Sequence, residues 1–239
     1  MSVPTADVLR WGHERARTGP WRGDRHVAYL APLPNSPLPS SEFVKRCLAI
    51  LADRGFARVV TGALLPAEQG GFLAAGFAVE QRLHLLGVDL RPPLPAVPDG
   101  LVLRRGGRSR HADILAVDRA AFSTFWRFDA RTLLDAISAT PHTRVRTAIG
   151  DQGHVIGYAI CGRAVRRGFV QRLAVDPAGQ GTGTGRRLLL DGLHWLRRRG
   201  ARRALVNTQV GNDVALALYL AAGFREEPSG LSVLSAGLR

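Results

Sequence analysis

Hydrophobic residues in the second half of the chain follow two different spacings. Short, mostly apolar runs predict strands, whereas apolar residues that recur every three or four positions predict helices. Strands are expected at Leu101–Arg104, Thr143–Ile149, Val155–Arg163, Phe169–Val175, Arg203–Thr208 and Ser229–Leu238. Helices are expected at Ala112–Phe122, Asp129–Ala139, Arg186–Arg199 and Val214–Ala222. Strands and helices mixed in this order predict an α/β layered fold.

The first half carries a shorter version of the same pattern. Strands are expected at Val27–Ala31, Arg58–Gly62 and Glu80–Leu90. The segment 91–100 contains four prolines, which forbid a regular helix or a central strand and favour a stiff, extended chain. This segment is expected to be a linker that divides the chain into residues 1–98 and 99–239.

Two stretches of sequence recur in the same order in both halves. Residues 47–60 and 192–205 each combine helical periodicity, a glycine stop and the start of a strand. Phe72-Leu-Ala-Ala-Gly-Phe77 then corresponds to Tyr219-Leu-Ala-Ala-Gly-Phe224. A repeat at this separation predicts tandem copies of one α/β unit. The alternative is a chance recurrence of common helix and turn sequences.

A glycine-rich turn follows the strand expected at Phe169–Val175. Gly181, Gly183 and Gly185 carry no side chains, so backbone amides there can approach a ligand closely. The helix that opens at Arg186 adds unpaired N–H groups and a partial positive charge. Together these features suit an anion, in particular a phosphate group. A plain strand-to-helix turn is the alternative interpretation.

Two motifs of the second half follow each other at a set spacing. The first is a Q/R-x-x-G-x-G/A loop after the strand at Phe169–Val175, formed by Gln180, Gly183 and Gly185. The second is an N-x-x-A-x-x-L-Y-x-x-x-G-F helix and turn after the strand at Arg203–Thr208, formed by Asn212, Ala215, Leu218, Tyr219, Gly223 and Phe224. With both motifs, the chain resembles the GCN5-related N-acetyltransferases over roughly Leu101–Leu238, a family that carries them after its fourth and fifth strands. The resemblance implies a mixed central sheet flanked by helices, with a partial, degenerate copy at the N-terminus. It also implies acetyl-CoA as the donor and an amine as the acceptor.

The resemblance assigns the acetyl-CoA site to particular positions. Backbone groups of Leu173, Ala174 and Val175 would pair with the pantetheine arm and the acetyl carbonyl. The pyrophosphate would lie beside Gln180 and against the backbone amides of Gly181, Thr182, Gly183, Thr184, Gly185 and Arg186. Asn212 would hydrogen-bond the pantetheine region, cap the helix that follows it, or do both. No metal ion is implied.

Tyr219 is the candidate general acid. After an amine attacks the thioester, CoA leaves as a thiolate that a nearby phenol can protonate. The alternative is a half-buried tyrosine that packs beside Leu218 and Phe224. Phe72 occupies the matching position in the first half, which is consistent with a catalytic hydroxyl group in the second half only.

The general base is not identified by the sequence. Members of the family often place a glutamate on the fourth strand, but the alternating positions here are Phe169, Gln171, Leu173 and Val175, without a carboxylate. A water chain to His154 or Asp129 stays open, as does an acceptor that enters as the free amine.

An aromatic segment between two expected helices is the candidate acceptor site. Residues 122–131 hold four aromatic side chains, and in the family this connection overhangs the acceptor. Phe122 and Trp126 would wall the pocket, Asp129 would meet an ammonium group, and Gln171 would face the acceptor. The alternative is a core-packing cluster in which Asp129 is a helix N-cap.

The first copy lacks the groups that would bind acetyl-CoA. Residues 33–41 hold prolines in place of the glycine loop, and prolines remove amide donors. Residues 1–98 are therefore expected to bind no CoA and to act structurally, by packing on the catalytic half, residues 99–239.

Composition narrows the partners. The net charge of +14 comes almost wholly from arginine, since Lys45 is the only lysine. Nucleic acid is an alternative partner for so basic a chain, but no nucleic-acid motif accompanies the charge. No stretch is apolar for long enough to span a bilayer, and no secretion is expected, because the N-terminus has neither a basic start nor an apolar signal core. Cys47 and Cys161 have no metal-binding or redox spacing. A cytoplasmic protein is expected, and a homodimer is left open.

The sequence thus predicts an N-acetyltransferase that transfers an acetyl group directly from acetyl-CoA to a primary amine of a small molecule or a peptide, in a ternary complex. Because no base is identified, the alternative is a catalytically weak or inactive acyl-CoA-binding regulatory protein.

Overall fold

Two compact units make up the chain in the computed structural model, which describes residues 7–33 and 36–238. The N-terminal unit combines Met1–Leu85, Gln209–Gly211 and Glu227–Arg239, and the C-terminal unit combines Leu86–Thr208 and Asn212–Glu226. The division differs from the boundary expected between residues 98 and 99, because the last strand of the chain pairs within the N-terminal unit. Pro34 and Asn35, in the proline-rich stretch 33–41, lie outside the described residues.

The N-terminal unit is built on a sheet with the strand order β1-β2-β3-β4-β12-β5. The strands are β1 (Asp7–Trp11), β2 (Glu14–Pro20), β3 (Val27–Pro32), β4 (Arg58–Thr61), β5 (Ala78–Asp89) and β12 (Leu231–Gly237). Helix α1 (Ser41–Asp53) connects the parallel strands β3 and β4, and α2 (Gly70–Ala74) precedes β5. The apolar face of α1 packs on this sheet and buries Phe43, Val44 and Leu51. The three strands expected in the first half are confirmed.

The hairpin of β1 and β2 was not predicted from the sequence. Its strands contain several charged residues, and β2 ends on Gly19 and Pro20, which are unfavourable in strands. Only Leu9 and Ala16 among its apolar residues are buried, in the core beneath α1. Pairing with β3, rather than local preference, therefore determines the conformation of this segment.

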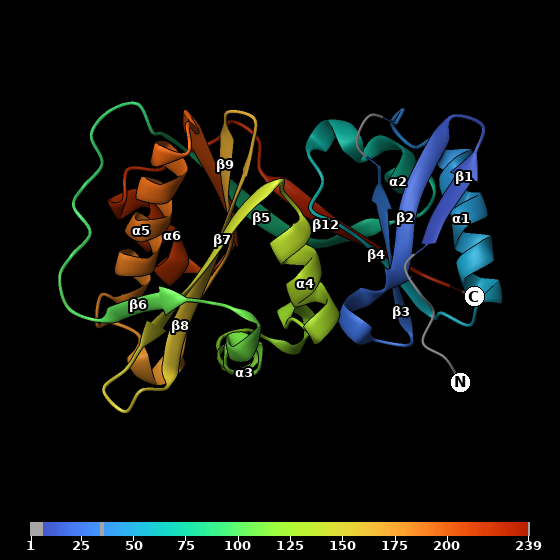
Figure 1. Cartoon of the computed structure of the whole chain (residues 1–239). Helices are drawn as coiled ribbons and strands as arrows, with labels where there is room; N and C mark the ends of the chain where they lie inside the picture. The colour runs from blue at the N-terminus through green and yellow to red at the C-terminus, as the bar shows by residue number, and fades with distance from the viewer. Residues whose placement is uncertain (1–6, 34–35, 239) are drawn as a thin grey trace. The chain divides into compact units, whose positions relative to one another are not determined.

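The C-terminal unit is a mixed sheet covered by helices on both faces (Figure 1). Its strand order is β5-β10-β9-β8-β7-β6, with β6 (Val102–Arg105), β7 (His142–Ile149), β8 (Val155–Ala164), β9 (Arg167–Val175) and β10 (Arg203–Gln209). Helices α3 (His111–Ala121) and α4 (Ala130–Ser138) cover one face, and α5 (Thr184–Arg198) and α6 (Asp213–Ala221) the other. A short strand, β11 (Arg225–Glu226), pairs with β5. Strand β11 was not predicted from the sequence, and the bounds of the other elements lie within two residues of the expected ones. The α/β fold with a mixed central sheet is confirmed.

The apolar side chains of this unit explain its layers. Tyr158 and Ile160 of β8 pack under α3 and α4, whereas the intervening Ala159 and the following Cys161 pack under α5. Both sheet faces are therefore buried, which accounts for the nearly continuous apolar run of β8. Within the ranges that the structure describes, no helix is both long and apolar enough to cross a membrane.

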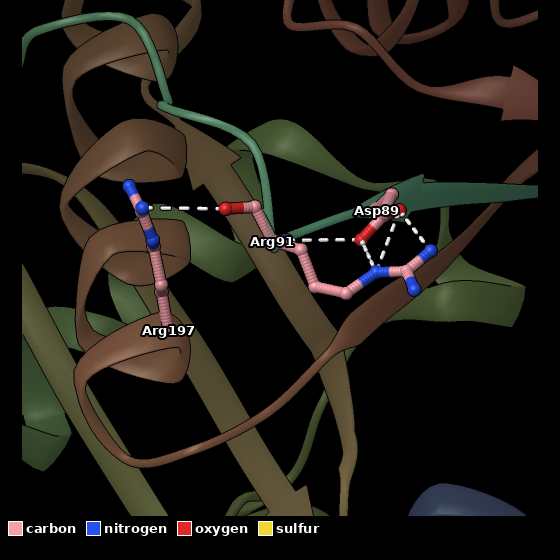
Figure 2. Close-up of polar contacts among 3 residues, drawn as sticks. All are labelled: Asp89, Arg91 and Arg197. Carbon is pink, nitrogen blue, oxygen red and sulfur yellow. Dashed lines mark hydrogen bonds and ion pairs between the residues drawn. The ribbon is translucent and has the colours of Figure 1, made fainter.

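The proline-rich segment after β5 is held against helix α5 instead of forming a free linker. The backbone amide, Nε and Nη2 of Arg91 donate hydrogen bonds to the Asp89 carboxylate (Figure 2). The carbonyl of Arg91 accepts a hydrogen bond from Arg197 Nη2 at 3.3 Å. His194 Nε2 donates to the carbonyl of Pro95 at 2.8 Å. These hydrogen bonds from Arg91 lower the pKa of Asp89 to about 2. The segment thus belongs to the C-terminal unit.

Strand β9 has two irregularities that shape the site. It pairs with β10 only through Arg167–Phe169, so the stretch from Val170 to Val175 has an unpaired edge on that side. A register shift against β8 also places Ile160 opposite Arg172 and Cys161 opposite Val170. Gln171 is the extra residue of this β-bulge.

The bulge changes which side chains of β9 share a face. The side chain of Gln171 lies near Gly162 and Thr140, and that of Arg172 contacts Asp118 of α3. The adjacent residues Gln171 and Arg172 therefore both face the layer of α3 and α4. Leu173 packs toward α5. The expected alternation of Gln171 and Leu173 on one face is therefore wrong, because simple period-two counting fails across an inserted residue.

We expect Val165→Gly to raise the free energy of unfolding by about 1 kcal/mol. Val165 begins the two-residue turn between β8 and β9, has a φ of +51°, and is 83% exposed. A β-branched residue is strained in this backbone region, and glycine is not. Urea unfolding of Val165→Gly and Val165→Ala tests the cause, since alanine keeps the strain. Equal stability of the two variants would contradict it.

Candidate functional site

The loop between β9 and α5 presents backbone amides at one point. Gly181 and Gly183 have φ angles of +78° and +84°, which suit glycine, and Gly183 is the N-cap of α5. The first hydrogen bond into the helix runs from Arg187 N to the carbonyl of Gly183, at 3.0 Å. The preceding amides of the helix have no carbonyl of an earlier turn to bind. A helix start of this kind is suited to an anion.

Side chains within the loop hold it in shape. Thr182 Oγ1 donates to the carbonyl of Gly179 at 2.8 Å and lies 2.8 Å from Thr184 Oγ1. Gln180 Nε2 donates to the carbonyl of Val175 at 3.3 Å. These hydrogen bonds run between groups of the loop and the end of β9, so the protein itself holds the loop amides in place.

A cavity of about 370 Å³ lies between this loop, β9 and α6. It brings together eleven of the residues expected at the site: Phe122, Leu173, Ala174, Val175, Gln180, Gly181, Gly183, Gly185, Arg186, Asn212 and Tyr219. Thr182 and Thr184 instead line an adjoining hollow of about 580 Å³. Trp126, Asp129 and Gln171 are not among the lining residues of either one.

Tyr219 is placed at the cavity by α6 and is only 5% exposed. Its ring lies 5.7 Å from that of Phe224, so it also packs in the core. Burial raises the pKa of Tyr219 above its ordinary value, the Cys161 thiol adds to the rise, and Arg172 opposes it. The phenol therefore carries its proton at neutral pH.

Asn212 is the N-cap of α6 and also lies at the cavity. Its Oδ1 accepts a hydrogen bond from Ala215 N at 3.2 Å and so caps α6. The same residue lines the cavity. Its amide group is thus oriented by the helix that carries Tyr219.

The aromatic segment between α3 and α4 contains one short 3-10 turn, Thr124–Trp126. Asp129 Oδ1 accepts from Thr132 N at 2.7 Å, which makes Asp129 the N-cap of α4. The ring of Trp126 packs edge-to-face on Phe125 at 5.0 Å. Gln171 Oε1 is buried without a hydrogen-bond partner among the described residues.

The two candidate bases lie away from Tyr219. His154 lines the hollow beside Asp99 and Arg187, at the turn between β7 and β8. Asp129 is engaged in its N-cap. Neither residue lines the cavity that holds the phenol.

A buried ionic cluster next to the cavity was not predicted from the sequence. Asp118 of α3 and Arg172 of β9 form an ion pair of 2.7 Å, and Tyr158 Oη donates to the same carboxylate. A signal was available: Asp118 occupies the apolar face that Ile114, Val117 and Ala121 mark at helical spacing. A charged residue in such a position is seldom buried unless it is paired.

Neither cysteine is a candidate nucleophile. Cys47 and Cys161 are free and buried, and burial raises the pKa of each thiol to about 12. Reactive cysteines need a lowered pKa and access to solvent. Both side chains are therefore packing residues.

The fold and the site define a class of protein: an α/β domain whose amide-rich loop opens onto a splayed pair of parallel strands, as the resemblance to acetyltransferases implies. Residues 112–224 match the model of the acetyltransferase (GNAT) family. A mycothiol acetyltransferase of Thermobispora bispora is 31% identical over 225 residues, which cover 82% of this chain and 75% of that protein. The chain belongs to the GCN5-related N-acetyltransferase family.

Two further comparisons concern the extent of the likeness. A mycothiol acetyltransferase of Nocardia farcinica is 31% identical over 198 residues, 74% of this chain and 63% of that protein. The chain thus spans less than two thirds of the length of this relative. A solved tandem GNAT protein from the clavulanic acid biosynthesis pathway matches 100% of this chain and 85% of its own, with a TM-score of 0.73 at 15% identity. This likeness shows a shared fold of two units.

Proposed function

We propose that the protein is an N-acetyltransferase that transfers an acetyl group from acetyl-CoA to a primary amine within a ternary complex. One observation carries the proposal: a single cavity is lined by the amide-rich loop, the unpaired edge of β9 and the buried phenol of Tyr219. These supply a phosphate-binding group, a backbone edge for an extended amide-containing arm, and a proton donor. Acyl-CoA has the matching parts in the same order.

In the proposed complex each part of acetyl-CoA meets one part of the cavity. The pyrophosphate lies against the amides of residues 181–186, beside Gln180. The pantetheine arm pairs with the free backbone edge at Leu173–Val175, in the way an added strand would. Asn212 contacts the pantetheine region, and the thioester lies near Tyr219.

The proposed chemistry uses no covalent enzyme intermediate. The free amine nitrogen attacks the thioester carbonyl carbon, which forms the C–N bond and a tetrahedral oxyanion. Collapse of this adduct breaks the C–S bond, and the CoA sulfur takes the proton of Tyr219 Oη. The proton released by the amine nitrogen restores the phenol through water. The amine must therefore arrive uncharged or lose its proton to solvent before the attack.

The acceptor is proposed to be a small-molecule or peptide amine held near Phe122, Trp126, Asp129 and Gln171. Relatives named mycothiol acetyltransferases make a mycothiol-related amine the first acceptor to test. A panel of amines would be assayed for release of CoA thiol, with acetyl-CoA alone as the control for hydrolysis. Amine-dependent thiol release supports the proposal.

A regulatory acyl-CoA-binding protein is the second candidate. It is favoured by the lack of a carboxylate in the stretch Phe169–Val175 of β9. Acetyl-CoA that binds tightly in calorimetry, without thiol release for any amine, would support this candidate over the enzyme.

We expect Asp129→Asn to raise the acceptor KM by about tenfold, the loss of one charge-assisted contact of roughly 1.4 kcal/mol. Asparagine caps a helix as well as aspartate does, so α4 and the melting temperature stay unchanged. Asp129→Ala is the matched variant that also loses the cap and about 1 kcal/mol of stability. An unchanged KM in Asp129→Asn would leave Asp129 with its capping role alone.

The N-terminal unit is proposed to be structural, and we expect one molecule of acetyl-CoA to bind per chain. Phe72, which corresponds to Tyr219, is fully buried and packs edge-to-face on Phe77 at 5.3 Å. The position thus offers no hydroxyl group and no access for a ligand. Isothermal titration calorimetry on the full chain measures the stoichiometry, and two equivalents would contradict the prediction.

A further inference from the structure

A buried ion pair lies directly beneath the aromatic segment that joins α3 to α4. The Asp118 side chain is fully buried and that of Arg172 is 9% exposed. Arg172 Nη2 and Nε lie 2.7 and 2.8 Å from the same carboxylate oxygen, Asp118 Oδ2. Tyr158 Oη also donates to that oxygen. Both charges are therefore paired within the core.

The remaining bonds of the pair go to the backbone of the segment. Asp118 Oδ1 accepts a hydrogen bond from Phe128 N at 2.6 Å. Arg172 Nη2 donates to the carbonyl of Trp126 at 2.6 Å. Asp118 thus binds a backbone amide of the segment, and Arg172 binds a backbone carbonyl two residues earlier.

The rings at the two ends of the segment enclose the guanidinium group. The guanidinium carbon of Arg172 lies 3.4 Å from the ring centroid of Phe122 and 4.0 Å from that of Phe128. Such cation–π contacts gain strength when the cation is desolvated. Phe122 is also a wall of the cavity that holds Tyr219. The guanidinium group therefore connects the ends of the segment to each other and to the site.

We propose that Arg172 is a positioning residue that fixes the segment Phe122–Phe128 as the wall of the acceptor site. The inference rests on the proposed function, because it assigns the segment to the acceptor. A buried ion pair is seldom needed for stability, since apolar residues of similar volume often replace it without loss. The arrangement here instead specifies one conformation of a connection whose regular structure is limited to the 3-10 turn Thr124–Trp126.

Two substitutions of Arg172 separate the contributions of its charge, its hydrogen bonds and its apolar stem. Arg172→Met keeps most of the apolar stem but loses the charge, the ion pair and the bond to Trp126. Arg172→Lys keeps a positive charge near the rings but cannot bond Asp118 and the Trp126 carbonyl with one planar group. The expected order of segment mobility is therefore wild type, then lysine, then methionine.

Hydrogen exchange and kinetics measure the result on the full chain. In Arg172→Met we expect amides of residues 122–129 to exchange about tenfold faster or more, as the loss of buried hydrogen bonds implies. The acceptor KM should rise by a similar factor, while the acetyl-CoA Kd stays unchanged. Arg172→Lys should restore part of both effects.

A matched control removes a different internal ion pair of the same unit. Arg144 pairs with Asp191 of α5 at 2.9 Å, and α5 covers the sheet face opposite to α3 and α4, between which the segment runs. Arg144→Met should therefore leave exchange in residues 122–129 and the acceptor KM unchanged. If Arg172→Met does not fold, Phe128→Leu, which removes one ring from the guanidinium group, takes its place.

Wild-type exchange in residues 122–129 together with a wild-type acceptor KM in folded Arg172→Met would overturn the inference. Equal effects of Arg144→Met would overturn it as well, because the change would then reflect general destabilisation. If wild-type protein acetylates no amine, the proposed function fails, and the exchange measurement alone still decides whether Arg172 fixes the segment.

Discussion

Tyr219→Phe should lower turnover by about 10²- to 10⁴-fold, the usual contribution of a general acid. The phenol is buried at the cavity beside Phe224, so the variant loses a hydroxyl group but keeps the ring and its packing. The affinity for acetyl-CoA should stay nearly unchanged, because the proposed contacts of its pyrophosphate and pantetheine arm are with the loop and β9. Single-turnover kinetics with saturating acetyl-CoA and a reactive amine would measure the chemical step directly.

The pH dependence of turnover is a second, independent test of the role of Tyr219. In the proposed mechanism the acid form of Tyr219 is the active one, and burial raises the pKa of Tyr219 above its ordinary value. Activity that depends on this proton is therefore fully present at neutral pH and is lost only as the pH rises past the ordinary tyrosine range, near 10. The alkaline limb should be missing in Tyr219→Phe. Full turnover of the variant, when chemistry is limiting, would reduce Tyr219 to a packing residue.

Gly183→Asp should weaken acetyl-CoA binding by about tenfold or more, since a like charge near the pyrophosphate costs at least about 1.4 kcal/mol. Gly183 is the N-cap of α5 and has a φ of +84°. Aspartate and asparagine both cap helices well and both tolerate this backbone region better than other residues do. The helix should therefore form in Gly183→Asp and in Gly183→Asn.

Comparison of the two variants isolates the charge. Gly183→Asn adds nearly the same volume without a negative charge, so its affinity should lie between those of the wild type and Gly183→Asp. The difference between the variants should shrink at high salt, because exposed charges are screened. Calorimetry that found the same acetyl-CoA affinity in both variants would argue against phosphate binding at this loop.

The sequence by itself determined most of the secondary structure of the C-terminal unit. Strands such as β8 are long apolar runs, and helices such as α5 carry apolar residues at regular helical spacing. Glycine at positions 181 and 183 also marked the loop, because few other residues accept a positive φ. These are local properties, in which each residue's preference can be read without its distant neighbours.

The tertiary structure decided what depends on pairing between distant segments. Strand β12 joins the N-terminal unit because its two edges pair with β4 and β5. The local sequence pattern of β12 cannot predict partners so far away in the chain. The β-bulge at Gln171 likewise arises from register against β8, and it turned Arg172 toward Asp118. The Asp118–Arg172 ion pair can form only when α3 lies on β9. Both charges are buried there, and a buried charge is tolerated only beside its partner.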